Sequence, residues 1–270
     1  MNDFAALARL IQAIEPWRVH LVIVGGWAHR LYRFHPMANV PTYQPLLTRD
    51  TDLAFANQAR LEGDIKSALV QAGFTEEFSG THQPPVTRYT LGDDDAGFYA
   101  EFLTPLQGSE VRRDGKPDAT VTKAGITAQK LRHLDILLID PWQIRVGSKL
   151  GFPLPQPIDL QVPNPTGFIV QKLLIQDDRP PAKRAQDVLY IHDALELFGG
   201  VLPELGVLWR DTIRPTLSQR TGRRVLDLSR ESFSTVTDIL RNAARIPQDR
   251  TLSPERMRAA CELGLEQILS

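Results

Sequence analysis

Apolar residues near the start of the chain recur at spacings that predict a helix, a strand and a second helix. Between positions 4 and 14 they return every three or four residues, which predicts an amphipathic helix over residues 3–15. Residues 21–24 are fully apolar and end at Gly25-Gly26, which is typical of a short buried strand followed by a turn. A second helix is expected over residues 28–34.

A proline-rich stretch then separates this start from further strands. Three prolines between positions 36 and 45 predict a loop, because proline fixes φ and removes a backbone donor. We expect a strand over residues 46–55 and a helix over residues 58–72 that ends at Gly73. Further strands are expected at residues 74–78, 87–91 and 98–103, with a hairpin turn at residues 92–97.

The second half of the chain is predicted to be mostly helical after an irregular middle. Residues 119–163, which include the apolar run 134–139, are expected to form strands at the edge of the sheet. Asn164-Pro165 predicts a helix start, with a capping side chain before a proline at the first helical position. Further helices are expected at residues 181–198 and in three stretches after residue 202, the last beginning at Ser253.

This order of elements predicts an α+β fold, in which a mixed sheet flanked by helices precedes a helical C-terminal domain. The expected domains are residues 1–162 and 163–270. A composition with 42% hydrophobic and 23% charged residues supplies a core and argues against general disorder. The net charge of −1 gives no global attraction for nucleic acid or an anionic membrane. A local basic patch could still be formed by the following residues: Arg112, Arg113, Lys116, Arg220, Arg223 and Arg224.

Cysteine content and hydropathy narrow the class of protein further. Cys261 is the only cysteine, which excludes an internal disulfide, and no Cys/His cluster has zinc spacing. We find no secretory signal and no apolar run of transmembrane length. The expected location is the cytoplasm, with no membrane partner.

Two aspartates two positions apart are the first candidate for chemistry. Asp50 and Asp52 lie in the predicted strand 46–55, where alternate side chains point to the same face. Close like charges repel unless a cation separates them, and oxygen ligands of this kind suit Mg²⁺. The structural alternative is a polar strand end in which Arg49 pairs with one of the aspartates.

Glu101 is a third candidate, because it is the only charged residue in the apolar strand 98–103. A charge in such a run is rarely buried without a partner. Placed beside Asp50 and Asp52, Glu101 would complete a three-carboxylate site for two metal ions, as a ligand or as the base for an attacking hydroxyl. The alternative is that Glu101 pairs with Arg88 across the hairpin.

In this order, the glycine pair, the Asp-x-Asp-Leu strand and the later acid resemble the nucleotidyltransferase superfamily of the DNA polymerase β type. Within it the chain is most similar to minimal and toxin-type bacterial nucleotidyltransferases, including the AbiEii-like group. The shared pattern is a glycine pair, a helix, a Thr/Ser-x-Asp-x-Asp-Leu strand and a later helical lysine. The resemblance covers residues 4–105 and, more loosely, residues 163–198.

The resemblance implies roles for the residues of the first domain. Gly25 and Gly26 would hold the triphosphate through backbone contacts. Asp50 and Asp52 would bind two Mg²⁺ ions, with Glu101 as the third carboxylate. The superfamily more often has aspartate at the position of Glu101.

The resemblance also implies nucleotide contacts beyond the carboxylates. Lys172, on the helix after Asn164, would neutralise phosphate charge in the transition state. Asp187 would orient Lys172 or Arg184, and Lys183 would help to bind the nucleotide. Arg49 would contact a phosphate or pair with Asp52. The structural alternatives are a snorkelling Lys172 and a surface pair between Lys183 and Asp187, four residues apart.

Several residues near these motifs stay ambiguous. Trp27 stands where the superfamily most often has a phosphate-gripping serine. His29 and Arg30 either contact phosphate or face solvent. His133 and His192 are expected to have no partners that would make a nucleophilic or metal site.

The function implied is transfer of a nucleoside monophosphate from an NTP, such as ATP, to a hydroxyl acceptor, with Mg²⁺ as cofactor and pyrophosphate as product. The active site is expected in a cleft between the two domains. The acceptor is open between RNA, such as a tRNA 3′ end, a protein side chain and a small molecule, and the toxin-type resemblance implies a possible antitoxin partner. One rival is a binding module of the same fold without activity, which Trp27 and Glu101 motivate. Another is a metal-dependent glycosyltransferase, which would not explain the glycine pair.

Overall fold

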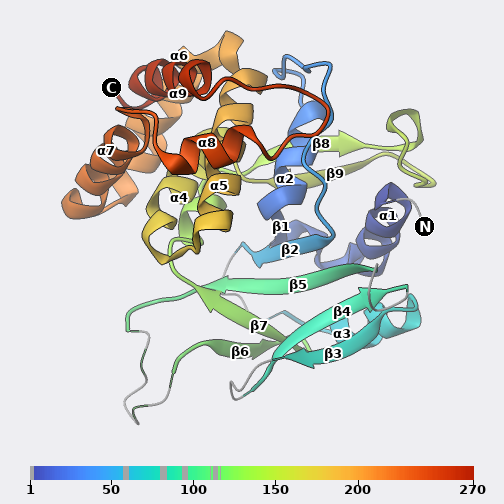
Figure 1. The fold of residues 1–270 in the computed structure, drawn as a ribbon. Coiled ribbons are helices and arrows are strands. Elements are labelled where there is room, and N and C mark those ends of the chain that lie inside the picture. The colour runs from blue at the N-terminus through green and yellow to red at the C-terminus, as the bar shows by residue number, and fades with distance from the viewer. Residues whose placement is uncertain are drawn as a thin grey trace. The chain divides into compact units, whose positions relative to one another are not determined.

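The chain divides into two units in the computed structural model (Figure 1). The first unit comprises Met1–Phe34 and Leu47–Val162, and the second comprises His35–Leu46 and Pro163–Ser270. The proline-rich loop therefore groups with the helical residues and not with the sheet on either side of it in sequence. The structure describes residues 3–56, 61–79, 84–92, 97–109, 111, 115 and 117–270. The predicted turn residues 93–96 and three members of the predicted basic patch, Arg112, Arg113 and Lys116, lie outside these ranges.

The first unit is built on a mixed sheet, as the sequence predicts, and the sheet has seven strands. The strands are β1 (Leu21–Val24), β2 (Asp50–Phe55), β3 (Thr75–Ser79), β4 (Val86–Leu91), β5 (Phe98–Pro105), β6 (Thr120–Lys123) and β7 (Ile126–Leu131). Their order is β1-β2-β5-β4-β3, and β7 pairs with β5 and carries β6. β2 and β5 run parallel, whereas β1 is antiparallel to β2 and β4 is antiparallel to β5. The strand bearing the aspartates thus lies directly beside the strand bearing Glu101.

Three short helices accompany this sheet. They are α1 (Asp3–Ala13), α2 (Gly25–Leu31) and α3 (Ile65–Gln71). α1 buries Leu7, Leu10 and Ile11 along one stripe, which confirms the helical spacing read from the sequence. α3 begins seven residues later than predicted, because Asp64 caps it by accepting a hydrogen bond from the backbone of Ser67 at 3.0 Å.

The middle of the chain corrects one part of the prediction. Residues 135–138 form a turn of 3-10 helix instead of a strand. His133 and Asp140 flank the turn with φ of 58° and 43°, a left-handed conformation that interrupts an extended chain on both sides. β8 (Trp142–Val146) and β9 (Ile158–Val162) then pair with each other in a separate two-stranded sheet.

The second unit is helical, as predicted. Its helices are α4 (Pro165–Leu174), α5 (Pro181–Leu197), α6 (Leu202–Val207), α7 (Gln219–Phe233), α8 (Asp238–Ala244) and α9 (Pro254–Leu269). Asn164 accepts a hydrogen bond from the backbone of Gly167 at 2.8 Å, and Ser253 caps α9 in the same way, so both predicted helix starts are confirmed. All ten residues of α4 are buried, which makes it the central helix of this unit.

Residues 35–46 are attached to α5 and to the segment before α9. The backbone N–H of Asn39 donates to the carbonyl of Leu197 at 2.7 Å, and the hydroxyl of Tyr43 donates to Glu196 at 2.5 Å. The backbone N–H of Gln44 donates to Asp249 at 2.7 Å. These contacts explain why a loop that follows the first helices in sequence folds with the second unit.

Candidate active site

The sheet of the first unit brings the three predicted carboxylates onto one face. Asp50 pairs with Tyr99 and Asp52 pairs with Glu101 in the parallel register of β2 and β5. Directly paired residues project to the same side of a sheet, as do alternate residues of one strand. Asp50, Asp52 and Glu101 therefore share a face, while the intervening Thr51 is fully buried on the other.

Gly25 leaves room for one of these carboxylates. It lies at the junction of β1 and α2 with φ of +66°, a conformation that favours glycine. A Cβ atom added to Gly25 would lie only 2.5 Å from the Oδ2 atom of Asp52. The glycine pair that was predicted to form a turn after β1 instead begins helix α2. At Gly25 the absence of a side chain lets the backbone lie close to the Asp52 carboxylate.

Neighbouring groups show that this face of the sheet carries negative charge. The hydroxyl of Thr48 donates a short hydrogen bond to Asp50, and the backbone N–H of Tyr99 donates to the carbonyl of Arg49 at 3.2 Å. Burial raises the pKa of the Tyr99 phenol, and the carboxylates of Asp50, Glu101 and Asp52 raise it further, against the opposing effect of Arg88. A field that disfavours a phenolate favours a bound cation.

Arg88 holds Glu101 in this structure. Its Nε and Nη2 atoms each lie 3.0 Å from the Oε1 atom of Glu101, and its guanidinium carbon lies 4.1 Å from the centre of the Tyr99 ring. The alternative that paired Glu101 with Arg88 across the hairpin is thus confirmed. Pairing and a place beside Asp52 are compatible, because the register puts Arg88, Glu101 and Asp52 side by side on three adjacent strands.

The carboxylates do not form a closed three-ligand cluster. Among the residues that the structure describes, Asp50, Asp52 and Glu101 do not bring ligand atoms within 4.8 Å of one another as a group of three. Metal binding by these three residues therefore stays a prediction, and in this arrangement Glu101 contacts Arg88. The donor set nevertheless fits Mg²⁺, since all its ligand atoms are carboxylate oxygens beside a glycine that leaves them space.

The residues next to the glycine pair belong to the core. Trp27 is fully buried, with its ring centre 6.2 Å from that of Phe4 and 6.1 Å from that of Phe98. The guanidinium of Arg30 lies 4.0 Å over the Trp27 ring and forms a 3.0 Å ion pair with Asp3. Of the two alternatives for His29 and Arg30, the one in which they face solvent is wrong, because both are buried.

In the second unit, Lys172 and Asp187 form a buried ion pair. The Nζ atom of Lys172 lies 2.7 Å from the Oδ1 atom of Asp187, and the two side chains are only 7% and 5% exposed. Arg179 approaches the other oxygen of Asp187 at 3.5 Å. Lys172 therefore does not snorkel to solvent, and Asp187 orients it.

Lys183 lies apart from that pair. It is exposed and its ammonium donates to Gln186 at 3.3 Å. The surface pair of Lys183 with Asp187 is wrong, because Asp187 turns inward to Lys172. Arg184 donates to the backbone carbonyls of Arg179 and Asp177.

Comparison with protein families settles the class to which this arrangement belongs. A family model described as Nucleotidyltransferase matches residues 2–212, well over half of the chain. The chain belongs to the nucleotidyltransferase family. Membership makes the protein a transferase with an NTP substrate. It also disfavours the rival interpretation of the Asp-x-Asp strand as part of a glycosyltransferase. No curated protein matches the chain. Among the helices that the structure describes, none has the length and apolar character to cross a membrane.

The second unit of this nucleotidyltransferase contains a cluster, buried at His192 and Asp193 and exposed at Glu196, that corrects the expectation that His192 has no partners. His192, Asp193 and Glu196 on α5 bring potential ligand atoms within 4.8 Å of one another. The Nη2 atom of Arg250 lies 2.6 Å from both oxygens of Asp193, and its guanidinium stacks 3.3 Å over the ring of Tyr43. Arg250 supplies the positive charge that a metal would supply, so the cluster anchors the loop 35–46. Its signal in the sequence was the spacing of His192, Asp193 and Glu196 on one helix.

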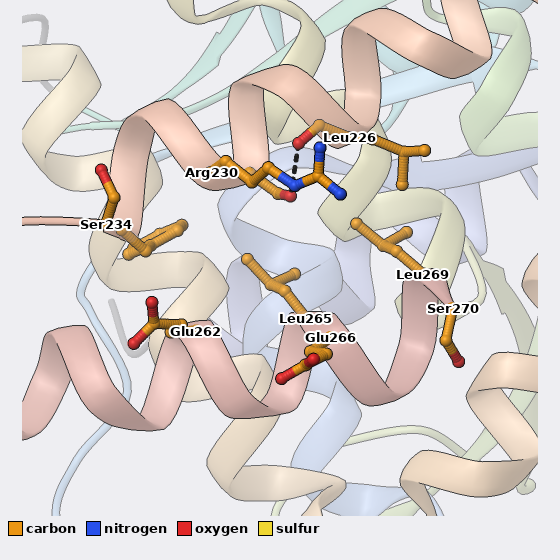
Figure 2. Close-up of a pocket in the computed structure, with 10 residues that line it drawn as sticks. Leu226, Arg230, Ser234, Glu262, Leu265, Glu266, Leu269 and Ser270 are labelled. Carbon is orange, nitrogen blue, oxygen red and sulfur yellow. Dashed lines mark hydrogen bonds between the residues drawn. The ribbon is translucent and has the colours of Figure 1, made fainter.

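A hollow of about 410 Å³ lies between α7 and α9 of the nucleotidyltransferase (Figure 2). Leu226 from α7 and Leu265 and Leu269 from α9 line it, together with the charged side chains of Arg230 and Glu266. None of the predicted site residues lines this hollow.

Proposed function

We propose that this nucleotidyltransferase transfers a nucleoside monophosphate from an NTP to a hydroxyl acceptor, with Mg²⁺ bound at Asp50 and Asp52 and pyrophosphate as the product. The observation that carries the proposal is the shared face of Asp50, Asp52 and Glu101, with Gly25 left bare against the Asp52 carboxylate. Two like charges placed together beside a third are costly unless the site serves a cation.

Asp50 and Asp52 are the residues assigned to hold two Mg²⁺ ions, with Glu101 as the third carboxylate. Bound metal would stabilise the charge that builds on the transferring phosphoryl group and on the leaving pyrophosphate. Arg88 is placed to hold Glu101 while it is not a ligand, at a distance of 3.0 Å.

Other residues are assigned to bind the nucleotide. Gly25 and Gly26 offer a backbone without side chains next to Asp52, which supports close approach of a phosphate. Arg49 precedes the first aspartate and is assigned to phosphate. In the second unit, Lys172 is assigned to neutralise phosphate charge, and the 2.7 Å contact with Asp187 supports the orienting role of that aspartate.

The acceptor is a hydroxyl group of RNA, including a tRNA 3′ end, of a protein side chain or of a small molecule. The toxin-type resemblance adds an antitoxin as a candidate partner, and the cytoplasm as the place of action. Lys183, which is exposed on α5, is assigned to nucleotide binding within the same proposal.

A second candidate keeps the nucleotide but not the reaction. The Arg88–Glu101 ion pair favours it, because a carboxylate held by a guanidinium is not available to a metal. Under this candidate the protein binds nucleotide or a protein partner without transferring the nucleotidyl group.

The two candidates are separated by transfer of label from [α-³²P]NTPs in the presence of Mg²⁺. The wild type is expected to label RNA, protein or itself, and Asp50→Ala/Asp52→Ala is expected to lose the transfer. Asp135→Ala is the matched control, because it removes an exposed carboxylate of the same unit outside the site. Nucleotide binding by the wild type without label transfer to any of these acceptors would favour the second candidate.

A further inference from the structure

Guanidinium groups gather on the N-terminal half of α7 in the second unit. We use the name arginine face for Arg214, Arg220, Arg223 and Arg224. Three of them, Arg220, Arg223 and Arg224, line a hollow of about 500 Å³ together with Gln219 and Asp227. The chain as a whole carries a net charge of −1, so this local concentration of positive charge is not a consequence of composition.

Two of these arginines are exposed, and a third, Arg224, is fixed by ion pairs. Arg220 and Arg223 are exposed, and no described carboxylate lies within ion-pairing distance of either. Arg224 is held by Asp177 at 2.7 Å and by Glu231 at 3.0 Å, which fixes its guanidinium before any ligand arrives. A mixture of fixed and exposed donors is suited to binding an anion with little loss of conformational entropy.

Gly222 makes room for the fourth guanidinium. A Cβ atom added there would lie 2.4 Å from the guanidinium carbon of Arg214, so the end of that side chain would have to move to admit it. Gly222 is the fourth residue of α7, where glycine favours the helix less than alanine does. Glycine at this position therefore leaves space for the Arg214 guanidinium.

We propose that the arginine face binds the phosphodiester backbone of a double-helical nucleic acid, which would be the hydroxyl acceptor. Naming the acceptor rests on the proposed function, whereas binding to the face does not. Arginine forks match phosphate oxygens bidentately. The positive end of the α7 dipole adds to the attraction.

The chemistry of the hollow distinguishes a double helix from a single strand. Proteins that bind single strands stack bases on aromatic side chains, whereas double-stranded RNA is recognised through phosphates and 2′-hydroxyl groups. The residues that line this hollow include no aromatic side chain. Asp227 lies within the hollow and would repel phosphate locally, and Asp177 and Glu231 already neutralise Arg224. The phosphate contacts are therefore assigned to Arg220 and Arg223.

The position of α7 in the sequence indicates that the face is separate from the shared catalytic machinery. The family match ends at residue 212, before α7 begins at Gln219. Residues beyond the match are where a chain of this family can acquire its own acceptor.

The test is fluorescence anisotropy with a labelled RNA stem-loop, a DNA hairpin of the same sequence and a single-stranded RNA, without NTP or metal. Arg220→Ala/Arg223→Ala is expected to weaken stem-loop binding by about tenfold or more. The slope of log affinity against log salt should fall by about 2, one for each lost phosphate contact. Arg256→Ala is the matched control, because it removes an exposed arginine of α9 and leaves the face intact.

A second variant addresses the arrangement of the face. Gly222→Ala favours the helix but displaces Arg214, so it is expected to weaken binding without lowering stability. Equal binding of RNA and DNA hairpins would support recognition of the backbone, and tighter binding of RNA would narrow the acceptor to RNA. Equal affinity of wild type and Arg220→Ala/Arg223→Ala, or stronger binding of the single strand, would overturn the proposal.

The outcome is independent of catalysis. Binding that depends on Arg220 and Arg223 in a protein that transfers no label would support the arginine face and reject the proposed reaction. Label transfer to protein or to a small molecule, with no binding of any nucleic acid, would reject the arginine face alone.

Discussion

Substitution of Gly25 by alanine should have two separate effects, one on stability through the backbone conformation and one on nucleotidyl transfer through the position of Asp52. The backbone has φ of +66°, and a residue with a Cβ atom there loses about 1–2 kcal/mol. For a protein of this size, about 1 kcal/mol shifts the melting temperature by roughly 2–4 °C, so a fall of about 2–8 °C is expected. The added Cβ would also lie 2.5 Å from Asp52 Oδ2, whereas an ordinary contact begins at 3.4 Å. The Asp52 carboxylate would therefore have to move by 3.4 − 2.5 = 0.9 Å.

A displacement of about 1 Å of a reacting group can reduce a rate by about 10²-fold. Gly25→Ala should therefore lose about two orders of magnitude in label transfer while the protein still folds. Gly151→Ala is the matched control, because Gly151 has φ of +83° and its added Cβ would meet only Phe4 at 3.6 Å, an ordinary contact. The two variants should show similar melting temperatures and very different transfer rates. Equal transfer rates would refute the reasoning that Gly25 is bare for the sake of Asp52.

Two further perturbations test the second unit. Asp187→Ala leaves the buried ammonium of Lys172 without its partner at 2.7 Å, and should lower the free energy of unfolding measured in urea by about 3–5 kcal/mol. The apolar double variant Lys172→Met/Asp187→Leu should lose much less stability, because it leaves no unpaired buried charge. A loss below about 1 kcal/mol for Asp187→Ala would contradict a stabilising ion pair. Burial lowers the pKa of His35, so the unfolded chain binds the proton more readily. Stability from this group is present above its ordinary pKa of about 6.5 and falls as the pH drops toward the folded value. His35→Asn should flatten the curve of melting temperature against pH below about pH 6.5. A curve identical to that of the wild type would contradict a role for the buried His35.

Local signals in the sequence predicted much of the fold. The apolar run 21–24 is a fully buried strand, and Asn164 and Ser253 cap helices through hydrogen bonds to residues three positions ahead. These features depend on neighbours within a few residues, which a sequence displays directly. Alternation along β2 likewise placed Asp50 and Asp52 on one face.

Features that depend on distant residues were not predictable in the same way. Arg250 reaches Asp193 across 57 positions, and Tyr43 reaches Glu196 across 153. No local spacing indicates these partners, so the loop 35–46 was not expected to group with the helical unit. Pairing of Lys172 with Asp187 came from the family resemblance and not from local spacing, because the partner of Asp187 at helical spacing was Lys183.

The outcome for Glu101 shows why both interpretations were necessary. A lone charge in an apolar strand indicated a partner but not which one. The register of β2, β5 and β4 places Glu101 between Asp52 and Arg88, and the guanidinium is the partner that it contacts. The register of the three strands depends on the whole sheet, and it is this register that shows Glu101 beside both Asp52 and Arg88.

The central claim is that Asp50 and Asp52 hold the metal ions of nucleotidyl transfer. The most direct measurement is anomalous diffraction from crystals grown with Mn²⁺ and a non-hydrolysable NTP. Anomalous density is expected at about 2.0–2.3 Å from carboxylate oxygens of both Asp50 and Asp52, close to the distances of hard-cation coordination. Density at His192, Asp193 and Glu196, with none at Asp50 and Asp52, would contradict it.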